Sequence, residues 1–73
     1  MNHTRDHITN RVYELRKKNA VTQEELAESL GVSRQTIIAI EKGNYAPSLL
    51  LSLKIARYFH KLVEEVFEYA YET

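Results

Sequence analysis

Two short amphipathic segments that meet at Gly31 restrict what this chain can fold into. Thr22 lies three residues before Glu25, the spacing at which each side chain can bond the other's backbone amide and so cap a helix that begins at Gln23. The apolar residues that follow recur at helical spacing: Leu26, Ala27 and Leu30. Gly31 then stands where the end of a helix favours a left-handed backbone. The sequence therefore predicts a helix over residues 23–30 and a tight turn after it.

A second short helix is predicted directly after that turn. Ser33 is a good N-cap, and Ile37 and Ile40 form an inward-facing stripe at helical spacing. Lys42–Gly43 ends the helix. Ile38 lies beside this stripe, and we expect it on the exposed side of the helix.

The flanking residues predict three more helices and a strand. Asn10 is an N-cap for a first helix with a basic last turn, and Pro47 followed by Ser48 predicts a loop and the cap of a fourth helix. The fifth helix has no good N-cap before it, and the segment after it alternates with the period of a strand. The predicted elements, in chain order, are helices over 11–18, from 49 to about 60 and over 62–66, and a strand over 67–71.

The length of the chain limits it to one domain, spanning residues 1–73. A chain of 73 residues buries only about 60% of its unfolded surface, and it has no cysteine to form a disulfide, so we expect it to associate with a partner subunit. The longest apolar run, residues 37–40, is far short of the roughly 20 residues that cross a bilayer. We expect no membrane or export segment, and the lack of cysteine suits the cytoplasm.

The charge of the chain is balanced overall but divided between its parts. The formal net charge is zero, yet all ten Lys and Arg lie before residue 62. Residues 1–61 carry a net +4 and residues 62–73 a net −4. A basic first part suits a negatively charged partner, whereas the acidic end suits solvent or a surface away from that partner.

Residues 23–42 resemble the helix-turn-helix of the lambda-repressor-like family, the phage Cro and repressor type. Ala27 corresponds to the small residue where the two helices touch, and Gly31 to the turn. The family's buried positions are matched by Leu26, Leu30, Val32, Ile37 and Ile40. The resemblance covers roughly residues 10–67. It implies an all-α, five-helix domain that binds double-stranded DNA.

The resemblance also implies which residues meet DNA. Base edges would be contacted by Arg34, Gln35 and Ala39: arginine can clasp guanine, glutamine can clasp adenine, and an alanine methyl can meet only the methyl of thymine. The residues that resemble the family's contacts to the DNA backbone are Gln23, Ser33, Thr36, Lys42, Asn44 and Tyr45. Backbone contacts position a protein on DNA without reading its sequence.

Simpler explanations exist for several of these residues. Ser33 caps a helix whatever else it does, and Arg34 and Gln35 could be ordinary solvated residues of a helix. Arg16 and Glu41 resemble a family ion pair that joins the first helix to the end of the recognition helix, which is a structural role.

No pattern in the sequence indicates catalysis. The histidines are His3, His7 and His60, and they have no cysteine or serine partner in a known spacing. Paired glutamates at 24–25 and 64–65 are adjacent on helices and therefore diverge. We expect no enzyme activity, no cofactor, no metal and no small-molecule ligand.

The sequence thus favours a transcriptional regulator, a repressor that binds a palindromic operator as a homodimer. The dimer interface is expected at Leu50, Val66, Phe67, Tyr69 and Tyr71, within a C-terminal dimerisation segment of residues 62–73. Similar small family members pair their termini, so we expect residues 6–9 and 67–71 to form an antiparallel ribbon. The alternative is an antitoxin-like half of a protein pair with an autoregulatory helix-turn-helix. The tail discriminates between them, since an antitoxin tail would be disordered in the isolated chain.

Overall fold

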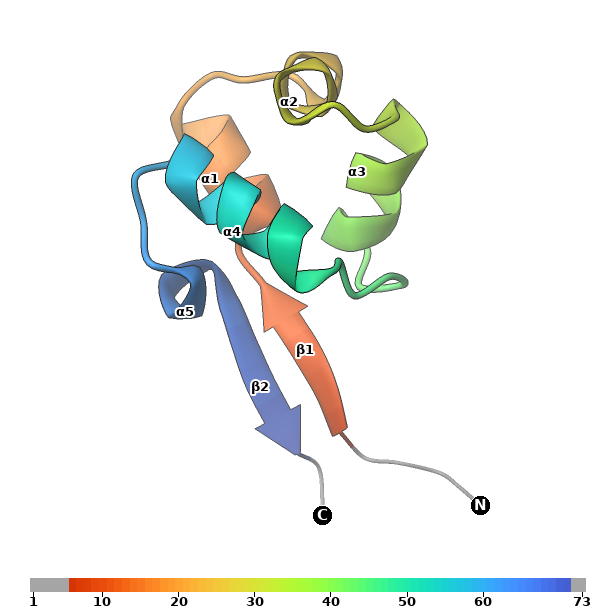
Figure 1. Cartoon of the computed structure of the whole chain (residues 1–73), viewed down its shortest axis with the longest axis vertical. Coiled ribbons are helices and arrows are strands. Elements are labelled where there is room, and N and C mark those ends of the chain that lie inside the picture. Colours follow the sequence, from red (N-terminus) through yellow and green to blue (C-terminus); the bar gives the residue numbers. More distant parts are fainter. Residues whose placement is uncertain (1–5, 72–73) are drawn as a thin grey trace.

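The computed structural model describes residues 6–71, so His3 and Glu72 lie outside the described residues. Its elements, in chain order, are β1 (Asp6–Asn10), α1 (Val12–Lys18), α2 (Gln23–Leu30), α3 (Arg34–Glu41), α4 (Leu49–Tyr58), α5 (Val63–Val66) and β2 (Phe67–Tyr71). Figure 1 shows the helices gathered in one body, from which β1 and β2 extend together. The predicted helical domain with a ribbon of its two termini is confirmed.

Hydroxyl side chains start three of the helices. Thr22, Ser33 and Ser48 each accept a hydrogen bond from the backbone amide three residues later, at 3.0, 3.2 and 3.1 Å. The amide of Thr22 also donates to the carboxylate of Glu25 at 2.9 Å, which completes the predicted capping box. The predicted starts of α2, α3 and α4 are confirmed. They could be predicted because each capping bond joins residues that are close in the sequence.

The other two helices start one residue later than predicted. The side chain of Asn10 accepts a hydrogen bond from the amide of Val12, at 3.0 Å, and α1 begins at Val12. In α5 the carboxylate of Glu65 accepts from the amide of Leu62, at 2.8 Å. Glu65 thus supplies one half of a capping box, while Leu62 has no side-chain oxygen to supply the other half.

Four helices end in the same backbone motif. After α1, α2, α3 and α4 the chain takes a positive φ, of 57° at Ala20, 76° at Gly31, 79° at Gly43 and 58° at His60. In each case the amide of that residue bonds the carbonyl three residues back, and the next amide bonds the carbonyl five residues back. At His60 this motif ends α4 at Tyr58, earlier than predicted.

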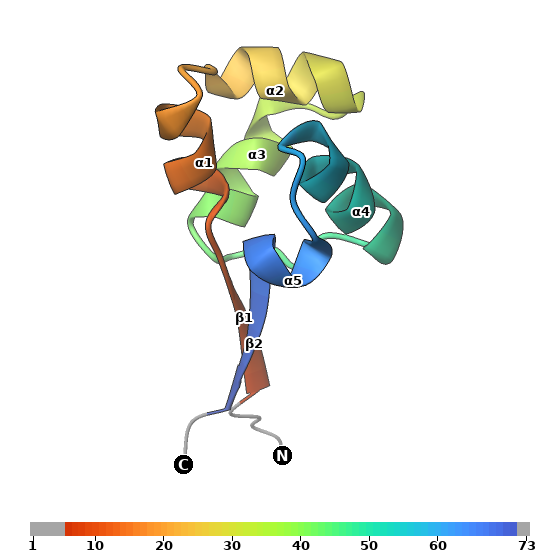
Figure 2. The ribbon, with the colours of Figure 1, turned by 90° about the vertical axis from the view of Figure 1, so that its left-hand side faces the viewer.

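The helices bury one shared core. The buried apolar residues come from every helix: Val12, Leu26, Ala27, Leu30, Ile37, Ile40, Leu51, Ile55, Ala56, Phe59 and Val66. The predicted stripes of α2 and α3 are among them, and Val32 is half-buried. Val66 is fully buried within this chain, so its assignment to a dimer interface was wrong. Figure 2 shows α1 and α4 on opposite sides of this body, with α2 lying across its top.

The ribbon is antiparallel, with Asp6 opposite Tyr71 and Asn10 opposite Phe67. It includes Asn10, one residue more than predicted. Phe67 packs on the core, whereas Ile8 and Tyr69, which are also opposite each other, stand 45% and 69% exposed. The ribbon therefore touches the body at one end and projects into solvent at the other (Figure 1).

Residues 6–71 contain neither a membrane-spanning helix nor a cluster of metal ligands. No helix there is long and apolar enough to cross a membrane. In the same part of the chain, no three histidine, aspartate or glutamate side chains gather as they would around a metal ion.

Candidate nucleic-acid interface

The first turn of α3 carries the side chains that were predicted to read bases. Arg34 and Gln35 are exposed there, whereas Ala39, one turn later, is half-buried. Ile38 is half-buried too, not on the exposed side as predicted, because it lies at the edge of the stripe that α3 packs on the core. The exposed length of α3 is therefore its N-terminal turn, which is the part that a helix-turn-helix presents to base edges.

A buried ion pair connects α1 to the last residue of α3. Arg16 donates from Nε to Glu41 Oε2 at 2.6 Å and from Nη2 to Glu41 Oε1 at 3.1 Å. The side chains are only 9% and 7% exposed. Hydrogen bonding to Glu41 raises the pKa of Arg16, which keeps the guanidinium charged. The ion pair expected from the resemblance is present, and it fixes the far end of α3.

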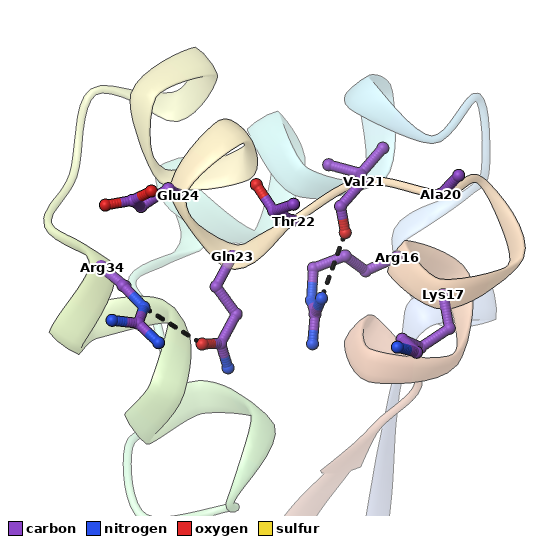
Figure 3. A pocket seen from close by; sticks show the side chains of 8 residues that line it. All are labelled: Arg16, Lys17, Ala20, Val21, Thr22, Gln23, Glu24 and Arg34. Atoms are coloured by element: carbon purple, nitrogen blue, oxygen red, sulfur yellow. Dashed lines mark hydrogen bonds between the residues drawn. The ribbon is translucent and has the colours of Figure 1, made fainter.

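Gln23 links the carboxylate of Glu41, at the end of α3, to Arg34, at the start of the same helix. The amide nitrogen of Gln23 donates to Glu41 Oε1 at 3.1 Å, and its amide oxygen accepts from Arg34 Nε at 3.2 Å. Figure 3 shows the side chains of Gln23 and Arg34 turned toward each other across the two helices. A chain of hydrogen bonds therefore runs from buried Arg16 to exposed Arg34.

This chain of hydrogen bonds fixes the orientation of the Arg34 side chain. Its Nε is held by Gln23, while its two terminal nitrogens have no partner among residues 6–71. Two parallel terminal N–H groups are what a bidentate contact to guanine requires. The sequence did not predict this role for Gln23. The one available signal was that Gln23 and Arg34 each take the first position of a helix.

A hollow of about 570 Å³ lies where α1, α2 and α3 meet, and it is lined by three cations, Arg16, Lys17 and Arg34. Gln23, at the start of α2, lies among them, and one acidic residue, Glu24, also faces the hollow (Figure 3). Because Glu41 neutralises Arg16, the excess of positive charge is that of Lys17 and Arg34 over Glu24, and it suits a phosphate group. Lys17 was not among the predicted contacts, although it stands in the basic last turn of α1.

The predicted backbone contacts lie on two separate parts of the surface. Gln23, Ser33 and Thr36 belong to the starts of α2 and α3, where Ser33 and Thr36 also bond each other through their hydroxyls at 3.0 Å. Lys42, Asn44 and Tyr45 are exposed on the loop between α3 and α4. The two groups lie at opposite ends of α3, so phosphate contacts could hold the helix at both ends.

The remaining predicted residues differ in accessibility. Tyr69 and Tyr71 are 69% and 58% exposed on the ribbon, and Leu50 is 70% exposed on α4, whereas Phe67 is half-buried. His7 is exposed on β1, and His60 is exposed in the turn after α4.

Comparison with known proteins agrees with this geometry. The family HTH_3, described as helix-turn-helix, matches residues 12–66. Over 60 residues the chain is 55% identical to the uncharacterized HTH-type transcriptional regulator YgzD of Bacillus subtilis, a match that covers 82% of this chain and 91% of that protein. It is also 31% identical over 59 residues to the cryptic phage CTXphi transcriptional repressor RstR of Vibrio cholerae, covering 81% of this chain and 53% of the repressor.

A solved structure gives the same result. The restriction-modification controller protein C.AhdI of Aeromonas hydrophila superimposes with a TM-score of 0.70 at 33% sequence identity. The match covers 75% of this chain and 83% of that one.

Proposed function

The chain belongs to the Cro/C1-type, lambda-repressor-like helix-turn-helix family of DNA-binding, non-enzymatic transcriptional regulators, and from this we propose that it is a repressor that binds a palindromic operator as a homodimer. The observation that carries the proposal is the arrangement at Arg34. Its guanidinium is bonded through Nε to Gln23, and its two terminal nitrogens have no partner among residues 6–71.

In the proposed complex the first turn of α3 enters the major groove. Arg34 bonds a guanine through its terminal nitrogens and Gln35 bonds an adjacent adenine. Ala39 meets a thymine methyl at the edge of the contact. Arg34 and Gln35 therefore carry most of the direct readout.

Phosphate contacts on both sides of α3 set its position in the groove. Gln23 uses one amide hydrogen on Glu41 and keeps the other for a phosphate. Ser33 and Thr36 contact the backbone beside it, and Lys17 adds a charge from α1. Lys42, Asn44 and Tyr45 hold the backbone at the other end of α3.

A homodimer follows from the small size of this contact. One exposed helical turn covers few base pairs, so two copies are needed, with recognition helices about 34 Å apart on one face of the DNA. Repression is supported by the similarity to RstR, which is named a repressor. The target is DNA in the cytoplasm, where a chain without cysteine is suited to function.

The antitoxin-like alternative is less well supported. It requires an acidic tail that is disordered in the isolated chain. Residues 67–71 instead form β2, paired along its length with β1.

The proposal is tested by selecting bound sequences from a random duplex pool at a stated salt concentration and then comparing Arg34→Ala with Lys42→Ala. Arg34→Ala should weaken binding to the selected site by about 1–3 kcal/mol and relax the preference at one base pair. Lys42→Ala should weaken binding to every duplex and make the slope of log affinity against log salt shallower by up to about one unit.

Two results would count against these roles. If Arg34→Ala loses the same affinity on all sequences, Arg34 touches only phosphate. If the salt slope of Lys42→Ala equals that of the wild type, Lys42 makes no phosphate contact. A pool that yields no preferred sequence would reject the proposed function itself.

A further inference from the structure

Four leucines stand exposed on α4 and just before α5. Leu49 and Leu50 are 71% and 70% exposed, Leu53 is 49% exposed, and Leu62 is 62% exposed. Single exposed leucines are ordinary, but adjoining ones form the kind of apolar surface that marks an interface. We call these four residues the leucine patch.

The leucine patch is continuous. Leu53 follows Leu49 by four residues and Leu50 by three, so it adjoins both on the surface of α4. Leu53 and Leu62 line one hollow of about 460 Å³, whose other apolar lining is Ala56 and Val63. The patch therefore offers both projecting leucines and a recess, as a surface that packs against its own copy requires.

Charges around the patch are of both signs. Arg57, Lys61 and Glu65 line the same hollow, and Glu64 is exposed beside them on α5. Among residues 6–71, Arg57 and Lys61 have no carboxylate within ion-pair distance. A surface of one sign would repel an identical surface, whereas a mixed rim around an apolar centre can pair with its copy.

We propose that a second copy of this chain binds to the leucine patch, through a two-fold contact in which leucines of each copy enter the hollow of the other. This deepens the proposed function, because it rests on the homodimer that operator binding requires. Figure 2 shows α4 on the opposite side of the body from α1 and the start of α2. A copy bound to α4 therefore leaves Gln23 and Arg34 free for DNA.

The proposed dimer interface differs from the predicted one at most of its residues. Leu50 keeps its predicted role, and Leu49, Leu53 and Leu62 join it. Val66 and Phe67 pack within the chain, and the hydroxyl of Tyr69 donates to Asp6 at 2.8 Å. The ribbon also leaves Ile8, Tyr69 and Tyr71 exposed, so it is the competing surface for a second copy.

The test compares two double variants by sedimentation without DNA. Leu50→Glu/Leu53→Glu should remain helical and become monomeric, with the dimer weakened by about a hundredfold. The matched control is Tyr69→Thr/Tyr71→Thr, which removes two side chains of similar exposure from the ribbon and should leave the dimer intact. Circular dichroism and a cooperative thermal transition show that each variant is folded.

The absence of cysteine permits a second readout that does not depend on weakening the dimer. Leu50→Cys and Tyr71→Cys each introduce the only thiol of the chain. A short bis-maleimide should join two copies through position 50 and not through position 71.

Three outcomes would overturn the proposal: a wild type that is monomeric at tens of micromolar, an unchanged dimer in Leu50→Glu/Leu53→Glu, or cross-linking at position 71 alone. Failure of the proposed function would look different. A wild-type dimer that depends on the leucine patch but selects no DNA sequence would reject the operator and leave this interface standing.

Discussion

Two ion pairs, one in the helical body and one beside the ribbon, join the same kinds of group in different surroundings. In the body, Arg16 and Glu41 make two hydrogen bonds and are 9% and 7% exposed. Beside the ribbon, Arg11 and Glu68 approach to 3.8 Å with side chains 52% and 64% exposed. Burial makes the first pair costly to break, while water competes with the second.

The helical body and the ribbon also differ in how deeply the contacts that hold them are buried. The body is held by a buried core and by the nearly buried pair of Arg16 and Glu41. The ribbon is held by its backbone ladder, and of its residues only Asn10, Phe67 and Ala70 are even partly buried. The body should therefore keep its structure without the ribbon, whereas a two-stranded ribbon alone is marginal in water.

The largest expected effect is at the buried pair. Glu41→Ala leaves Arg16 buried without a counter-charge and should lower the free energy of unfolding by about 3–5 kcal/mol. Glu68→Ala, the matched change at the ribbon, should lower it by about 0–1 kcal/mol. Urea unfolding measures both. Equal losses would show that burial does not separate the two regions.

A pair of truncations separates core from ribbon. A chain ending at Phe67 keeps the whole core and should lose about 1 kcal/mol or less, with its helical circular dichroism retained. A chain ending at Glu65 also loses Val66, and burial of that side chain alone contributes about 1.5–3 kcal/mol. If the two chains melt at the same temperature, the boundary between body and ribbon does not lie at residues 66–67.

The helix ends offer a way to strengthen the body alone. Ala20 and His60 hold a positive φ that costs a residue with a Cβ about 1–2 kcal/mol. Ala20→Gly and His60→Gly should each raise the free energy of unfolding by about 1 kcal/mol after the entropy of glycine is counted. Gly31→Ala is the converse control. A Cβ there meets nothing closer than Lys54 Nζ at 4.0 Å, so any loss comes from the backbone.

The smallest effect is a pH dependence of the ribbon. The hydrogen bond to Asp6 raises the pKa of Tyr69 above its ordinary value of 10.0. A raised pKa in the folded state means that this bond contributes in full below the unfolded pKa and is lost as pH rises through the folded pKa. Subtracting the phenolate absorbance titration of Tyr69→Phe from that of the wild type isolates Tyr69. A midpoint at or below the ordinary value would contradict the bond.

The features that the sequence predicted correctly are those encoded within a few residues. Thr22, Ser33 and Ser48 cap helices through bonds that span three residues, and Gly31 supplies its own backbone freedom. The end of α4 was placed too late because the residue with positive φ is His60, where no glycine marks the turn. Predicted boundaries were thus displaced where the local signal is weak, as at the start of α5, which has no good N-cap, and at the end of α4.

Features that depend on packing were predicted less well. Val66 is an apolar residue near the exposed tyrosines of the C-terminal segment, and only the fold shows that it faces the core, whereas the exposure of Leu50 was predicted correctly. The bond between Gln23 and Arg34 joins two helices, and no local pattern contains it. Base-reading residues were accessible to prediction through resemblance, but the group that orients Arg34 was not.

The pairing of β1 with β2 also has a consequence for the order of folding. This ladder closes a loop that includes nearly the whole chain. The loss of chain entropy on closing that loop opposes the first bonds of the ladder. The contacts of α2 with α3 are close in sequence and can form early. During synthesis the helices can therefore assemble while β1 waits unpaired, and the ribbon forms only after residue 71 has emerged.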